Sequence, residues 1–149
     1  MTRSISYCLL IAALTVVVVC TVMRPDLLSD HNEFLAHFVN QELLALLVII
    51  MTITLASAAN LHLEFNKIEE RYKKRGLTKT RHGVRQGAYF LIWLFSFSIL
   101  IVVLKPILAD GAALQSAFNG AALVVLLWNV LILVELTQLA FSIQPEIED

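Results

Sequence analysis

Four long runs of apolar residues, separated by polar segments, dominate the pattern of this chain. They cover residues 5–23, 42–60, 88–104 and 120–143, and each contains at most one formally charged residue. About 20 apolar residues in a helix cross the hydrocarbon layer of a bilayer, which is roughly 30 Å thick. The pattern therefore predicts an all-α polytopic membrane protein: one domain, residues 1–149, built as a bundle of four transmembrane helices.

Composition agrees with this interpretation. Hydrophobic residues make up 58% of the chain and charged residues only 15%, whereas soluble domains carry about 25% charged residues. The first run is long for the apolar core of a signal peptide, and no small-x-small cleavage pattern follows it. We therefore expect residues 5–23 to be a retained transmembrane helix.

Basic residues are concentrated between the second and third runs. Residues 61–86 hold eight of the eleven Lys and Arg residues, and the other three are Arg3, Arg24 and Lys105. Short loops rich in Lys and Arg stay in the cytoplasm. The charge distribution therefore predicts that the N-terminus, the basic segment and the C-terminus are cytoplasmic, and we expect the membrane to be a bacterial inner (plasma) membrane.

The second helix is expected to continue beyond the membrane. From Gln41 to Arg75 the sequence contains no Gly and no Pro over 35 residues, and a continuous helix of that length would be about 52 Å long. We therefore predict a cytoplasmic helical hairpin over residues 61–87, between the second and third transmembrane helices. Apolar residues recur along its first arm at steps of four, three and four, which is typical of a packing seam.

This seam has two possible partners: the chain's own third helix, or another subunit or soluble protein. Together with nearby basic residues it forms the predicted partner-docking set: Leu61, Phe65, Ile68, Tyr72, Lys73, Lys74, Arg75, Arg81 and Arg85. Basic side chains next to a membrane attract anionic headgroups, so the expected partners are the anionic cytoplasmic face of the bilayer and a cytosolic protein. Acidic residues alternate with the basic ones here, and we expect no direct nucleic-acid binding.

Glu135 is the ionisable residue placed deepest in an apolar run, and such a carboxylate marks a functional-site hypothesis. It could bind a proton or cation, pair with Arg81 or Arg85, or hydrogen-bond to Ser57 or Asn60. The full set of expected intramembrane polar residues is Asn129, Glu135, Gln138, Ser57 and Asn60. Asn129 falls on a different face of its helix from Glu135, which suggests two helix neighbours and favours a homo-oligomer.

The first loop, residues 24–41, is predicted to contain a short amphipathic helix capped by Asp30, with Glu33 three positions later in capping-box spacing. Of His31, Glu33 and His37, only Glu33 and His37 share a helical face, and two candidate ligands are too few to predict a metal site. The sequence contains no phosphate-binding Gly-rich loop, HExxH, CxxC or nucleophile elbow. We therefore expect no catalytic residues, no metal and no cofactor.

The functional prediction is a non-enzymatic membrane subunit that homo-oligomerises. It would act as a scaffold, sensor or anchor for a cytosolic partner bound at the basic 61–86 segment. By analogy at the level of fold, such a chain suits membrane subunits of bacterial stress or phage-defence systems. The alternative is a small oligomeric pore that conducts ions past Glu135 and Asn129.

Overall fold

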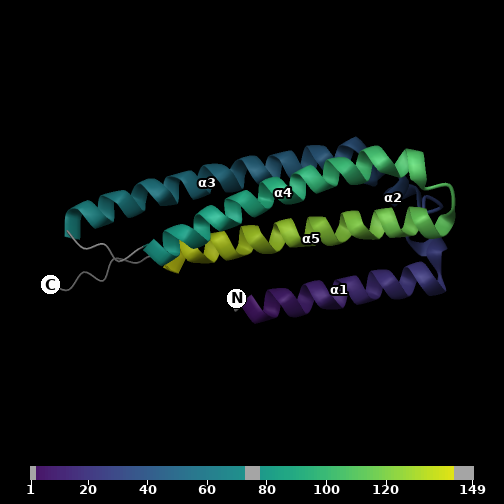
Figure 1. Cartoon of the computed structure of the whole chain (residues 1–149), viewed down its shortest axis with the longest axis horizontal. Helices are drawn as coiled ribbons and strands as arrows, with labels where there is room; N and C mark the ends of the chain where they lie inside the picture. The colour runs from purple at the N-terminus through teal and green to yellow at the C-terminus, as the bar shows by residue number, and fades with distance from the viewer. Residues whose placement is uncertain (1–2, 73–77, 143–149) are drawn as a thin grey trace.

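The computed structural model describes residues 3–72 and 78–142, and every regular element in them is helical. The long helices are α1 (Arg3–Met23), α3 (Leu43–Tyr72), α4 (Thr78–Leu108) and α5 (Ala112–Ser142). They lie side by side along one axis (Figure 1). The prediction of an all-α fold is confirmed, and four helices are long and apolar enough to cross a membrane.

Short helical segments connect α1 to α3: η1 (Pro25–Leu27), α2 (Glu33–His37) and η2 (Phe38–Glu42). These segments and the α4–α5 connection lie at one end of the bundle, called the α2 end below (Figure 1). At the opposite end, called the hairpin end, lie the C-terminal turns of α3 and the N-terminal turns of α4. The chain kinks at Val39 and Asn40, where the backbone leaves helical geometry before α3 begins.

Two helix boundaries differ from those predicted. α5 begins at Ala112 rather than at residue 120, and α4 continues past Pro106 to Leu108. Residues 112–118 are small and only weakly apolar, so hydropathy alone separated them from the membrane run. In the structure buried Ser116 contacts Thr21 of α1, and half-buried Gln115 accepts from the Asp30 backbone N–H, so this segment packs as part of the long helix. Pro106 lies inside α4, two residues before its end, and has no N–H to donate to the Val102 carbonyl.

The core is formed by three of the long helices, with the fourth at its side. α5 packs against α3 and α4, which also pack on each other, whereas α1 packs mainly on α5. Buried apolar side chains from all three central helices meet in one cluster that includes Leu47, Phe65, Leu91, Leu94, Val125 and Ile132. Only 6% of the residues in the apolar window of α1 are buried, so the rest of the chain covers little of the α1 surface.

Three contacts fix α1 against α5. The Ser6 hydroxyl donates to Glu135 Oε1 at 3.1 Å, and the Thr21 and Ser116 hydroxyls lie 3.0 Å apart. Between these pairs, a Cβ added to Gly120 would collide with the side chain of Val17. The two helices are therefore antiparallel and closely packed around Gly120.

A buried ion pair closes the α2 end of the bundle. Lys105 Nζ lies 2.7 Å from Asp30 Oδ1, and the two side chains are 8% and 33% exposed. The buried Asn119 side-chain amide donates to Asp30 Oδ1 at 3.0 Å and to the Leu28 carbonyl at 2.8 Å. Gln115 Oε1 accepts from the Asp30 backbone N–H at 3.2 Å. The first loop is thereby held on both α4 and α5.

This network replaces the predicted capping role of Asp30. The N-cap of α2 is Asn32, whose side chain accepts from the backbone N–H groups of Phe34 and Leu35. The predicted capping box is therefore wrong. Asp30 turns instead toward Lys105, because a buried ammonium requires a carboxylate partner more strongly than an exposed helix end requires a cap.

The electrostatic balance at Asp30 favours the ionised form. Partial burial acts to raise its pKa, but the hydrogen bonds from Lys105 and Asn119 and the charges of Lys105 and His31 outweigh burial. The pKa of Asp30 therefore lies below its ordinary value of 3.8. Folding is favoured by this carboxylate above pH 3.8, and that contribution is lost as the pH falls through the lowered pKa.

We predict that Asp30→Asn lowers the free energy of unfolding in detergent by about 3 kcal/mol at neutral pH, because it leaves the buried Lys105 ammonium without a counter-charge. Thermal or denaturant unfolding of the purified protein measures this change. The wild-type protein should lose stability on acidification below pH 3.8, and the variant should lose less over the same range.

Asp26→Asn is the matched control, because the Asp26 side chain is in the same loop but 77% exposed. We expect its unfolding curve to stay close to that of the wild type. Equal destabilisation by the two substitutions would contradict a special role for the Asp30–Lys105 pair.

Candidate functional site: the hairpin end of α3 and α4

The hairpin end is built on apolar contacts between α3 and α4. Phe65 is fully buried in the core cluster together with Val84 of α4, and half-buried Leu61 packs against that cluster. Phe65 therefore packs within its own chain, which is the first of the two alternatives considered for the seam. Neighbouring Glu64, Lys67, Glu70 and Arg71 are exposed, so this part of α3 has one apolar face and one charged face.

An ion pair joins the two helices near the end of this contact. Arg81 Nη2 of α4 donates to Glu69 Oε2 of α3 at 2.9 Å, and the two side chains are only 29% and 20% exposed. Arg81 Nε is buried and has no hydrogen-bond partner among the described residues. The pair fixes the rotation of α3 relative to α4 at the point where the helices leave the apolar core.

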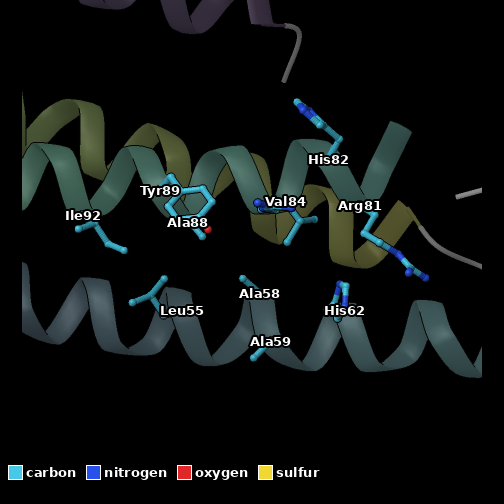
Figure 2. Close-up of a pocket in the computed structure, with 11 residues that line it drawn as sticks. Leu55, Ala58, Ala59, His62, Arg81, His82, Val84, Ala88, Tyr89 and Ile92 are labelled. Carbon is cyan, nitrogen blue, oxygen red and sulfur yellow. The ribbon is translucent and has the colours of Figure 1, made fainter. Parts of the chain in front are cut away.

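A pocket of about 540 Å³ lies beside this junction, between α3 and α4. Sites for small organic molecules commonly have volumes of roughly 300–1,000 Å³. In Figure 2, Leu55, Ala58 and His62 point from α3 toward α4, while His82 points away from α3. The pocket is lined by the small side chains of Ala58, Ala59 and Ala88, which are too short to fill the space between the two helices.

The pocket is polar at one end and apolar at the other. Toward the hairpin end it is lined by His62, Arg81, His82 and Arg85. Toward the middle of the bundle it is lined by Leu55, Ala59, Ala88 and Ile92. The Arg85 guanidinium lies over the Tyr89 ring, 5.5 Å from its centroid, an arrangement that stabilises a cation next to an apolar surface.

The structure separates the predicted docking residues into groups. Phe65 and Leu61 pack in the core, Arg81 pairs with Glu69, and Arg85 is exposed at the pocket. Lys73, Lys74 and Arg75 lie outside the described residues, as do the side chains of Ile68 and Tyr72. Docking therefore remains a prediction, and Phe65 itself is not available at the surface to a partner.

The predicted intramembrane polar residues do not form one site. Glu135 accepts a hydrogen bond from Ser6 of α1, so its partner is neither of the arginines nor Ser57 nor Asn60. Asn129 is 1% exposed and donates to the Val125 carbonyl of its own helix at 2.9 Å. Ser57, Asn60 and Gln138 are exposed on the surfaces of α3 and α5.

The sequence analysis did not identify several residues of the site. His62, His82 and Tyr89 line the pocket, but no sequence pattern groups them. The available signal is the run of small residues Ala56, Ser57, Ala58 and Ala59 at the end of the second apolar segment, which is typical of close helix packing and does not predict a cavity. Within the described residues, no group of three or more His, Cys, Asp or Glu side chains could hold a metal ion.

Comparisons with protein-family models, with curated proteins and with solved structures found no match to this chain. Its function must therefore be argued from its own geometry.

Loss of the Glu69–Arg81 pair should loosen the hairpin end. We predict that Glu69→Gln destabilises the protein by about 2 kcal/mol, between the values for exposed and fully buried pairs, because the half-buried guanidinium keeps its charge without a partner. Hydrogen exchange should become faster at the backbone amides of residues 61–71. Glu70→Gln removes the same charge from the next, exposed position and should leave exchange unchanged, and equal effects of the two would show that the pair is unimportant.

Proposed function

We propose that this chain is a non-enzymatic, multi-pass membrane protein that anchors a cytosolic protein at the hairpin end. The observation that carries the proposal is the joined hairpin end itself. There α3 and α4 are fixed by buried Phe65 and by the Glu69–Arg81 pair while they present charged side chains. A preformed charged surface at the end of an apolar bundle is suited to docking, because little ordering is needed when a partner binds.

The lengths of the helices support a membrane location. α3 has 30 residues, equivalent to about 45 Å, and the hydrocarbon layer takes roughly 30 Å of that. When the membrane segment of α3 begins at Leu43, its last turns extend beyond the bilayer as the charged arm of the hairpin. All four apolar helices then cross the membrane, and the α2 end and the hairpin end lie on opposite sides.

The charge distribution supports placing the hairpin end in the cytoplasm. Eight of the eleven basic residues belong to the segment around it, and such loops are retained inside. At the α2 end, the Lys105 ammonium is paired with Asp30. Among the described residues of that end, Arg24 is the basic residue without a carboxylate partner. Pairing of Lys105 therefore increases the difference in unpaired basic charge between the two ends.

The surface of α3 supports the proposal of a homo-oligomer. Thr52, Ala56, Ser57 and Asn60 are all exposed along one side of this helix. Small and polar residues let membrane helices approach closely and hydrogen-bond to each other. A second copy packed on this side of α3 would shield Asn60 from lipid, while the hairpin ends of the copies would lie together.

The proposal predicts that charge at the hairpin end is required for docking. A cytosolic protein should co-purify with the wild-type chain from its own host, and Lys73→Glu with Lys74→Glu and Arg75→Glu should abolish this. The introduced Glu side chains would repel acidic groups on the partner that the basic side chains attract. We therefore expect at least a ten-fold loss of the co-purified protein. Quantitative mass spectrometry, followed by binding of the purified partner, measures the change.

Arg24→Glu is the control, because Arg24 is an exposed basic residue at the opposite end. It should leave the co-purified protein unchanged. Equal capture by the charge-reversed protein and the wild type would contradict the anchoring role. An ion flux into liposomes that Glu135→Gln or Asn129→Leu abolishes would support the pore alternative instead.

A further inference from the structure

We infer that the pocket between α3 and α4 binds an anionic phospholipid of the cytoplasmic leaflet, with the phosphate at Arg85 and an acyl chain along the apolar part. This inference rests on the membrane orientation in the proposed function and names a ligand for the same end of the molecule. It does not depend on any cytosolic partner. Basic pockets between transmembrane helices on the cytoplasmic side are suited to anionic headgroups.

The depth of the pocket matches the position of a lipid phosphate. From Leu43 to His62 on α3 the helix rises about 30 Å, and from Lys105 to Arg85 on α4 it also rises about 30 Å. With the α2 end at the outer boundary, both His62 and Arg85 reach the inner boundary of the hydrocarbon layer. Tyr89 lies one turn deeper on α4, where interfacial aromatic residues are common.

The shape of the pocket matches an acyl chain below the headgroup. Leu55, Ala58, Ala88 and Ile92 line its deeper part without a charged side chain. Its volume of about 540 Å³ accommodates a headgroup and the first part of a chain. Tyr89 is 56% exposed and Ile92 is 44% exposed, so the pocket opens on the helix surface that faces lipid.

The charges around the pocket favour an anion. Arg85 is exposed, and no carboxylate of the described residues lies within ion-pair distance of it. Arg81 is already paired with Glu69, so Arg85 is the cation at the pocket that is open to a ligand. A phosphate oxygen accepts from the Arg85 guanidinium, and a zwitterionic headgroup binds less favourably because Arg85 repels the cation of that headgroup.

A lipid fits these features better than a peptide does. A soluble protein segment reaches the charged rim from the cytoplasm, but the apolar part lies within the bilayer and opens toward lipid. A phospholipid in the cytoplasmic leaflet already has its anionic headgroup at the level of the rim and its acyl chains at the level of the apolar part. It can therefore enter the pocket without leaving the bilayer.

The test is lipid binding by the full-length protein in detergent micelles. Phosphatidylglycerol and phosphatidylcholine with identical chains are titrated, and native mass spectrometry and the thermal unfolding midpoint report binding. We expect phosphatidylglycerol to bind more tightly and to raise the midpoint more. Arg85→Gln should weaken phosphatidylglycerol binding about five-fold, the scale of one basic residue near an anionic surface, with little change for phosphatidylcholine.

Two further variants separate the pocket from general attraction. Lys67→Gln removes a basic residue that is 70% exposed at the same end but outside the pocket, and it should bind phosphatidylglycerol like the wild type. Ala88→Leu fills the apolar part without changing charge and should weaken binding of the lipid. Its unfolding midpoint without added lipid shows whether it is folded.

Equal loss with Lys67→Gln and Arg85→Gln would overturn the inference, because any cation at this end would then serve. Inorganic phosphate at the same concentration should give no midpoint shift, and a shift equal to that of the lipid would overturn the role of the acyl chain. If the wild-type protein binds the two lipids equally but still captures the cytosolic protein, only this inference is refuted. Loss of capture with lipid selectivity intact would refute only the anchoring function.

Discussion

The interior of the bundle shields buried polar side chains from water, and this constraint governs how each of them finds a hydrogen-bond partner. The hydroxyls of Thr54 and Ser98 donate to carbonyl oxygens four residues earlier in their own helices, and so does the Asn129 amide. These three buried side chains therefore donate their hydrogen bonds within their own helices. Among the residues that the structure describes, Glu135 is the carboxylate deep within an apolar segment, and it accepts a hydrogen bond from Ser6 of α1.

The same constraint moves the ionic contacts to the two ends of the bundle, and α4 takes part in both. Arg81 near its start pairs with Glu69 of α3, and Lys105 near its end pairs with Asp30 of the first loop. α4 is thus fixed at both ends by contacts that are partly shielded from solvent. The hairpin end differs from the α2 end because it combines its ion pair with a pocket and with additional exposed charge.

Much of the fold follows from the pattern of the sequence, whereas the contacts between segments do not. The four apolar helices and the continuation of α3 beyond its apolar run were predictable, because helix length and hydropathy are local properties. Asp30, Lys105 and Asn119 lie far apart in the sequence, so no local spacing indicated their network, and the predicted cap at Asp30 was wrong. The pocket was also unpredictable, because it depends on how small residues of α3 face small residues of α4 where the two helices pack together.

The central claim is that the hairpin end is cytoplasmic and the α2 end faces outward. Labelling of single cysteines with a membrane-impermeant maleimide tests it most directly, in a chain with Cys8→Ser and Cys20→Ser. Asp110 and Lys67 are exposed at the α2 end and the hairpin end respectively. The account predicts that Asp110→Cys is labelled in intact cells and that Lys67→Cys is labelled only after the membrane is disrupted. Labelling of Lys67→Cys in intact cells would contradict it.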